Sequence, residues 1–256
     1  MKISFLGAHN TESRDTRLVS LLIDDVLALD AGGLTSSLSF AEQLRLKAIL
    51  LTHQHYDHIR DIPLIAMNLF LRQAGIDVYS ISSVGDALAS YLLNDSLYPK
   101  FLEKSQDKEI ISFHTVKPYQ IIQIEGYSVL PVPVAHSVPA VGYQVTSPDG
   151  KAVLYTGDTG PGLSHLWQYI SPQLMINEVT APDRYRQFGE EKGHLTPGLL
   201  KEELLGFQKV RGYLPDVVAV HMNPELEAEI AAELADVAEE LGNSITLAYE
   251  GRQLSL

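Results

Sequence analysis

The sequence predicts an α/β fold in which two β-sheets pack face to face and helices cover both outer faces, a four-layer αββα sandwich. Two strand-rich stretches, residues 3–29 and 120–155, are each followed by alternating helices and strands. The chain has 256 residues, of which 45% are hydrophobic, and this is enough to bury a large core. Since no repeat, low-complexity tract or Pro/Ser-rich linker divides it, we expect a single domain over residues 1–256.

In the first half, short apolar runs bounded by turn residues predict strands at 3–6, 18–23, 26–29 and 48–51, with a tight turn at Asp24-Asp25. Amphipathic spacing predicts helices at 36–46 and 62–73, the second with a proline near its first turn. Residues 78–116 contain two helical stretches, 87–93 and 100–104. We expect residues 78–116 to form a cap over the mouth of a site.

In the second half, apolar runs predict strands at 120–124, 127–134, 142–146, 151–155, 174–177, 217–220 and 245–248. Helices are expected at 163–169, 196–207 and 224–241. The last of these is acidic at helical spacing, which is typical of a solvated helix face.

Composition limits the classes of function. The net charge is −13, and no Lys/Arg-rich block offsets it locally. Because proteins that grip long nucleic acids displace counterions with basic side chains, we expect no extended nucleic-acid partner. The absence of cysteine excludes disulfides and leaves His, Asp and Glu as metal ligands. No apolar run reaches the roughly 18 to 20 residues of a membrane span, and residues 1–7 read as a strand rather than a signal peptide, so we expect a cytoplasmic protein without membrane contact.

One segment concentrates groups that bind metals. Thr52-His53-Gln54-His55-Tyr56-Asp57-His58 places three imidazoles and a carboxylate directly after the strand predicted at 48–51. Borderline metals such as Zn²⁺ favour these ligands, and a loop can turn alternate side chains toward two neighbouring centres. The alternative is a solvated polar loop, but four ionisable groups crowded after a buried strand would cost stability without a counter-ion. We therefore expect His53, His55, Asp57 and His58 to bind metal.

Three further candidates each follow a predicted apolar strand: His136, Asp158 and His221. Any one of them alone would be more typical of a structural residue. The repeated arrangement of strand and then ligand indicates that the strand ends converge on one point. Three other histidines lie outside this pattern and are expected to be ordinary surface or core residues: His9, His114 and His165.

The pattern His-x-His-x-Asp-His, followed in order by His136, Asp158 and His221, is similar to the metallo-β-lactamase superfamily over nearly the whole chain. Leu29-Asp30-Ala31-Gly32 also resembles that superfamily's first motif. The resemblance implies a metallo-β-lactamase sandwich with two divalent metal ions, and Asp30 would orient a ligand histidine through its second ring nitrogen. One metal would be held by His53, His55 and His136, the other by Asp57, His58 and His221, and Asp158 would bridge them. Zinc is expected, with manganese and iron open, because such ligands accept all three.

Within the superfamily, residues 136–143, 177–180 and 193–196 resemble the branch of transfer-RNA 3′-processing endonucleases and related phosphodiesterases. The resemblance implies that His194 contacts the scissile phosphate rather than a metal, and it gives catalytic roles to His194 and to Asp57. The role of Glu178 stays open. Residues 93–101 faintly resemble cyclic-nucleotide phosphodiesterases of the same superfamily, although core packing would also explain them. Tyr56 and Tyr98 are expected to serve packing, with stacking on a substrate base as the alternative.

The chain departs from the processing endonucleases at one point. Those enzymes carry a long RNA-gripping arm, commonly inserted between the positions that match His136 and Asp158. Here that interval is about twenty residues and is filled by two predicted strands. We therefore expect a two-metal phosphodiesterase acting on a small or cyclic phosphodiester, with a cyclic nucleotide as the first candidate.

Other functions stay open at this point. They are a ribonuclease Z-like endonuclease without the arm, a lactonase or sulfatase on the same metals, and, outside enzymes, a metal-binding sensor or scaffold. The sequence does not set the substrate, the metal or the oligomeric state, and a homodimer is one open expectation.

Overall fold

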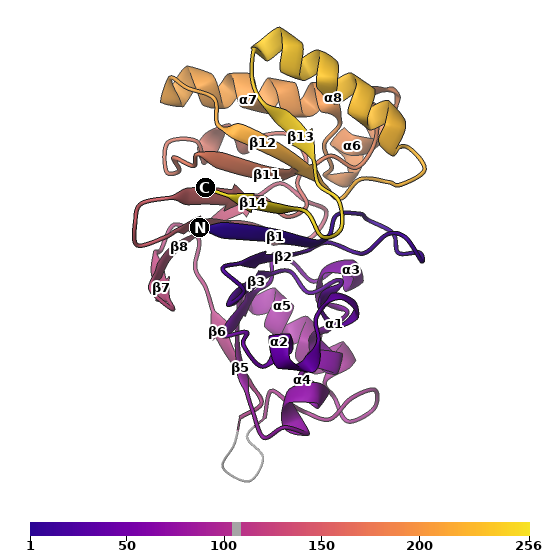
Figure 1. The fold of residues 1–256 in the computed structure, drawn as a ribbon, viewed down its shortest axis with the longest axis vertical. Helices are drawn as coiled ribbons and strands as arrows, with labels where there is room; N and C mark the ends of the chain where they lie inside the picture. The colour runs from indigo at the N-terminus through magenta and orange to yellow at the C-terminus, as the bar shows by residue number, and fades with distance from the viewer. Residues whose placement is uncertain (104–108) are drawn as a thin grey trace.

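The computed structural model describes residues 1–103 and 109–256. Within these ranges the strands form two seven-stranded sheets, and helices cover the outer face of each sheet (Figure 1). The predicted four-layer αββα sandwich is therefore confirmed. The core between the sheets contains fully buried apolar residues of both, such as Phe5 and Leu21 from the first and Val145 and Ile176 from the second.

The first sheet has the strand order β14-β1-β2-β3-β4-β5-β6. Its strands are β1 (Lys2–Gly7), β2 (Ser20–Ile23), β3 (Leu27–Leu29), β4 (Ala48–Leu50), β5 (Ile76–Ser80), β6 (Ile111–Thr115) and β14 (Gln253–Ser255). Strands β3 to β6 are parallel, and β14, β1, β2 and β3 are antiparallel. The outer face is covered by α1 (Leu34–Ser37), α2 (Phe40–Gln43), α3 (Tyr56–Ile59), α4 (Ile62–Phe70), α5 (Ser82–Ala87) and the π-helical turn η1 (Leu88–Leu92).

The second sheet has the order β13-β12-β11-β10-β9-β8-β7. Its strands are β7 (Ile122–Ile124), β8 (Tyr127–Val134), β9 (Ala140–Thr146), β10 (Ala152–Tyr155), β11 (Leu174–Glu178), β12 (Asp216–Val220) and β13 (Ile245–Leu247). Strands β7 to β10 are antiparallel, and β10 to β13 are parallel. Its helical elements are η2 (Leu163–His165), η3 (Asp183–Tyr185), α6 (Arg186–Lys192), α7 (Pro197–Arg211) and α8 (Glu227–Leu241).

The helix predicted over 36–46 is wrong, because the chain forms two short helices there. Ser39 ends the first stretch and caps α2, since its side chain accepts from the Glu42 amide while the Glu42 carboxylate accepts from the Ser39 amide. Such a reciprocal capping box starts a new helix. The helix predicted at 163–169 is only the short 3₁₀ turn η2, and α6 and β14 were not predicted.

Residues 78–116 differ from the expected cap at both ends. β5 and β6 bring these ends into the first sheet as its last two strands, and α5 packs on the same sheet's outer face (Figure 1). The sequence pattern of β6 was hard to recognise, because β6 is an edge strand whose last two residues are exposed. The helix predicted at 100–104 is wrong for residues 100–103, which form no helix, and residue 104 lies outside the described ranges. Whether the part between β5 and β6 narrows the site mouth stays a prediction.

α7 and α8, each of 15 residues, are the longest helices in the described part of the chain. No helix in that part is both long and apolar enough to cross a bilayer.

Candidate metal centre

The predicted ligands lie together at one edge of the sandwich. The loop after β4 and the start of α3 supply four of them, and the segments after β8, β10 and β12 supply one each: His53, His55, Asp57, His58, His136, Asp158 and His221. The carboxyl ends of β3 to β6 share one edge of the first sheet, and those of β10 to β13 share one edge of the second. Ligands that follow different strands can therefore meet at one place.

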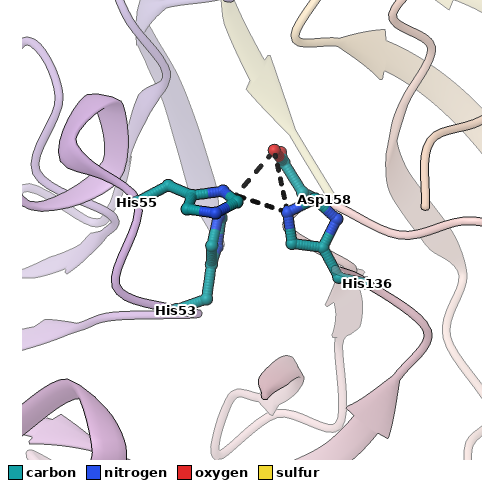
Figure 2. A group of neighbouring side chains, drawn as sticks. All are labelled: His53, His55, His136 and Asp158. Carbon is teal, nitrogen blue, oxygen red and sulfur yellow. Dashed lines mark hydrogen bonds and ion pairs between the residues drawn. The ribbon is translucent and has the colours of Figure 1, made fainter. Parts of the chain in front are cut away.

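The first group contains His53, His55, His136 and Asp158. Their ligand atoms all lie within 4.8 Å of one another. His136 Nε2 is 3.1 Å from His55 Nδ1, and Asp158 Oδ2 is 3.9 Å from Nε2 of both His53 and His136. Figure 2 shows the three rings and the carboxylate pointing toward one another. This arrangement of nitrogen and oxygen donors can surround one cation.

The second group contains Asp57, His58, His221 and the same Asp158, again with ligand atoms within 4.8 Å of one another. Asp158 Oδ1 is 3.2 Å from His58 Nε2, and Asp158 Oδ2 is 3.4 Å from His221 Nε2. Asp57 Oδ2 lies 3.4 Å from His58 Nε2 and 3.3 Å from His221 Nε2. Asp158 therefore belongs to both groups.

Unpartnered buried atoms show that these residues fit metal ions. Among the described residues, the buried His53 Nε2 has no hydrogen-bond partner, and the buried atoms His58 Nε2 and Asp158 Oδ1 lie 3.2 Å apart without forming a hydrogen bond. A buried polar atom without a partner typically costs about 1–3 kcal/mol. Since all three atoms face the two groups, a divalent cation in each group would satisfy them.

The charge states of the first group also suit a metal. Burial lowers the pKa of His53, His55 and His136 below the ordinary imidazole value, so these rings are neutral near pH 7. A neutral ring with an available lone pair is the form that binds a metal ion.

The second group attracts positive charge. Burial lowers the pKa of His58, but the Asp158 and Asp30 carboxylates raise it more, so that this pKa lies well above its ordinary value. Burial raises the pKa of Asp158, but His221 and His58 lower it more, which keeps the carboxylate ionised. A divalent cation would be attracted by the same carboxylates that favour the proton on His58.

Asp30 organises the ligand loop from behind. It is fully buried, and its Oδ2 accepts hydrogen bonds from His58 Nδ1 at 2.7 Å and from the Tyr155 hydroxyl at 2.7 Å. The Thr52 amide donates to Asp30 Oδ1 at 2.8 Å, and the Thr52 hydroxyl oxygen lies 3.0 Å from His53 Nδ1. Because these partners hold the Nδ1 atoms of His58 and His53, both Nε2 atoms turn toward the metal groups.

A second polar network holds His194 beside the ligands. The fully buried Glu178 accepts from His194 Nδ1 at 2.8 Å and from the Thr180 hydroxyl at 2.8 Å, and Thr180 accepts from His221 Nδ1 at 2.9 Å. Burial lowers the pKa of His194, but the Glu178 carboxylate raises it more, to about 9. His194 is therefore an imidazolium at neutral pH. Sequence reasoning left Glu178 open and missed Thr180, although both follow the apolar run of β11.

Left-handed backbone occurs at Gly193 and His221, and also at Asp30. Gly193 has φ +77°, and a Cβ there would lie 2.8 Å from the His136 Cα. Its carbonyl accepts from His136 Nδ1 at 2.8 Å, so the glycine lets the backbone reach this ligand. His221 has φ +62° although it is not glycine, a conformation that costs on the order of 1–3 kcal/mol.

The three histidines outside the pattern lie outside both groups, as expected. His9 is buried with Nδ1 2.7 Å from Glu250 and Nε2 3.2 Å from Glu227. His114 pairs with Asp77 at 3.0 Å on an exposed edge, and His165 Nδ1 lies 3.0 Å from the Gly162 carbonyl.

This fold and this centre are those of a known class of protein. Residues 22–239 match the family described as "Beta-lactamase superfamily domain", and the chain belongs to that family. The predicted membership of the metallo-β-lactamase superfamily is therefore confirmed.

Its similar proteins include curated relatives named Ribonuclease Z. The one from Acaryochloris marina is 29% identical over 213 residues, which are 75% of this chain and 62% of that protein. The one from Pyrococcus furiosus is 25% identical over 160 residues, 59% of this chain and 50% of that protein. The chain thus spans less than two thirds of the length of these relatives.

Solved structures share the fold at low sequence identity. Yeast PDE1 has a TM-score of 0.87 at 16% identity, covering 100% of this chain and 99% of that one. The metallo-β-lactamase fold protein YhfI from Bacillus subtilis has a TM-score of 0.76 at 16% identity, covering 99% and 98%. The short form of human tRNase Z has a TM-score of 0.68 at 19% identity, covering 100% and 99%.

Proposed function

We propose that the chain is a two-metal phosphodiesterase that hydrolyses a small or cyclic phosphodiester, with a cyclic nucleotide as the first candidate. The position of His194 carries this proposal. Its ring centroid lies 5.1 Å from that of His136 in the first ligand group and 5.6 Å from that of His221 in the second. A phosphate held between the two groups would therefore meet an imidazolium.

In this proposal the seven predicted ligands hold two zinc ions, with manganese or iron as alternatives, and Asp158 serves both. When bound, two divalent ions lower the pKa of water and offset charge on phosphoryl oxygens. Glu178 holds His194 Nδ1, so the Nε2 proton of His194 is the one offered to a phosphate oxygen or to the leaving alcohol. Such help typically contributes on the order of 10²- to 10⁴-fold in rate. Asp57, with a side chain 29% exposed, is the ligand assigned to contact the reacting groups as well.

Two features support a small substrate. The chain between His136 and Asp158 consists largely of β9 and β10, which leaves no length there for an RNA-gripping arm. The net charge of −13 opposes a long polyanion, whereas metal ions would supply local positive charge for a compact phosphate.

A ribonuclease acting on transfer-RNA precursors is the second candidate. The observation that favours it is the name of the curated relatives, Ribonuclease Z, at 24–29% identity.

Turnover of substrates of different size separates the two candidates. We expect kcat/KM for cyclic AMP or bis(p-nitrophenyl) phosphate to exceed that for precursor transfer RNA, with only a modest change between 50 and 200 mM salt. Protein stripped of metal by a chelator is the control and should be inactive. Cleavage of precursor transfer RNA with a steep salt dependence, and no turnover of any small diester, would refute the proposal and favour the ribonuclease.

A further inference from the structure

A cavity adjoins the network that holds His194. It measures about 300 Å³ and is lined by Asn10, Thr180, Ala181, Tyr185, Phe188, Asn223 and Leu226. Thr180 belongs both to this lining and to the hydrogen-bond network of Glu178, His194 and His221. The cavity therefore begins beside the place assigned to the phosphate.

Aromatic rings connect the metal centre to this cavity. The His194 ring stacks on His221 with an interplanar angle of 12°, and the Phe188 ring lies parallel to His194 at 8° with centroids 6.1 Å apart. Phe188 and Tyr185 are 45% and 38% exposed. Partly exposed aromatic faces of this kind bind planar ligands, and any of the nucleobases can stack on them.

Two of the polar residues of the lining, Asn10 and Asn223, carry carboxamides. Asn10 Oδ1 is buried and has no hydrogen-bond partner within the described part of the chain. Asn223 Oδ1 accepts from the Glu225 amide at 2.9 Å, so its nitrogen is the end available as a donor. A carboxamide matches the edge of a nucleobase, where a donor and an acceptor lie side by side.

We propose that this cavity binds the nucleobase of a nucleotide phosphodiester whose phosphate lies at the metal centre, an inference that rests on the proposed function. The base would stack beside Phe188 and Tyr185 and donate a hydrogen bond to Asn10. A volume of about 300 Å³ is at the lower end of the range for small-molecule pockets, which suits one base.

A neighbouring hollow disfavours a longer nucleic acid. An adjoining hollow shares Asn223 with the cavity and is lined by Glu225 and by Glu12, of which Glu12 is paired with Arg60. The negative charge of Glu225 would repel a second phosphate group of a continuing strand. The substrate class is therefore a single nucleotide unit.

A second cavity, of about 330 Å³, contains Tyr56 and Tyr98 and is less suited to a base. Its cationic group, Arg60, is already engaged by Glu12 and by Asp61. The remaining lining residues are apolar: Pro63, Leu64, Leu92 and Leu97. Their side chains cannot form hydrogen bonds with the edge of a base.

Adenosine, which has no phosphate, tests the cavity without the metal reaction. We expect calorimetric titration of the metal-free protein to detect adenosine binding, and Asn10→Leu to weaken it about tenfold, the size typical of one lost carboxamide contact. Because Asn10 Oδ1 is unpartnered, the substitution should leave the melting temperature equal or higher. Asn94→Leu, which removes a carboxamide on the loop after η1, and Tyr98→Phe in the second cavity should leave adenosine binding unchanged.

The metal-loaded enzyme gives an independent readout. The ratio of kcat/KM for cyclic AMP to that for the baseless 1-deoxyribose 3′,5′-cyclic phosphate should fall about tenfold in Asn10→Leu. Equal adenosine binding by Asn10→Leu and the parent, or no adenosine binding by the parent at millimolar concentration, would overturn the proposal. Diester hydrolysis without a base preference refutes the base site but leaves the phosphodiesterase, whereas adenosine binding without hydrolysis of any diester supports the base site and refutes the phosphodiesterase.

Discussion

Replacing Asp30 with asparagine should distinguish the effect of Asp30 on metal affinity from its effect on the free energy of unfolding. In the parent protein, Oδ2 of this buried carboxylate accepts from His58 Nδ1, the Tyr155 hydroxyl and the Thr52 hydroxyl, and Oδ1 accepts from the Thr52 amide. Asparagine is nearly the same size but turns one of these oxygens into a donor. Whichever way the carboxamide faces, its NH₂ group therefore lies against at least one buried donor, which loses its hydrogen bond.

The cheaper orientation keeps the carbonyl oxygen where three donors meet and places the amide nitrogen against the Thr52 amide. One unmet buried donor costs about 1–3 kcal/mol of unfolding free energy. The opposite orientation leaves both His58 and Tyr155 unmet, at roughly twice that cost. Even in the cheaper orientation, His58 loses the negative charge behind it and Thr52, which contacts His53, is displaced. Loss of such outer support typically weakens metal binding about 10- to 100-fold.

Asp61→Asn is the matched control. Asp61 is also fully buried, and its two oxygens accept from the Thr35 amide at 2.6 Å and from Arg60 Nε at 3.0 Å. Either orientation of the carboxamide leaves one donor unmet, so the stability loss should be similar, but no predicted ligand is hydrogen-bonded to it. Urea unfolding of the metal-free proteins measures stability, and competition with a zinc chelator measures metal affinity. The reasoning fails if Asp30→Asn binds zinc within twofold of the parent, or if both variants lose affinity equally.

Three further predictions concern the ligands, the phosphate contact and a buried histidine. His55→Ala should remove metal from the first group, and Asp158→Ala should reduce metal in both, measured by elemental analysis; two ions retained in Asp158→Ala would contradict its shared position. His194→Ala should keep its metals and its fold but lose on the order of 10²-fold or more in kcat, whereas loss of metal would identify His194 as a ligand. Burial lowers the pKa of His9, but Glu250 and Glu227 raise it above 6.5 overall. Its stabilising charge is therefore fully present below pH 6.5 and is lost as pH rises through the raised pKa. His9→Gln should accordingly destabilise metal-free protein more at pH 6 than at pH 9 in urea unfolding, and an equal loss at both values would show that the charge on His9 is unimportant.

Continuous apolar runs made most strands predictable, because a strand buried on both faces has no polar positions to obscure it. β4 and β12 are examples, since nearly all of their residues are buried. The edges of the first sheet were harder. β14 has three residues, two of them exposed, and it forms only by pairing with β1 at the other end of the chain. Such long-range pairing leaves no local pattern in the sequence.

The grouping of the predicted ligands could be expected because each is a metal-binding residue type placed shortly after an apolar strand. Glu178 ends β11 and Thr180 follows it, but neither carries an equally specific signal. Their part in the site depends on contacts with His194, 14 to 16 residues away, and with His221, 41 residues from Thr180. The cavity beyond them could not be predicted, because its lining residues come from three separate segments of the chain.

The two sheets contribute to the centre unequally, and this has a consequence for stability. The first sheet supplies His53, His55, Asp57 and His58, whereas the remaining ligands come from the second. Each metal ion would therefore connect the sheets. Each unpartnered buried atom of the two groups costs about 1–3 kcal/mol, which bound ions would offset. Domains are typically stable by only about 5–15 kcal/mol, so costs of this size matter. Because ions would bind the folded arrangement and not the separated ligands, we expect metal binding and folding to be coupled.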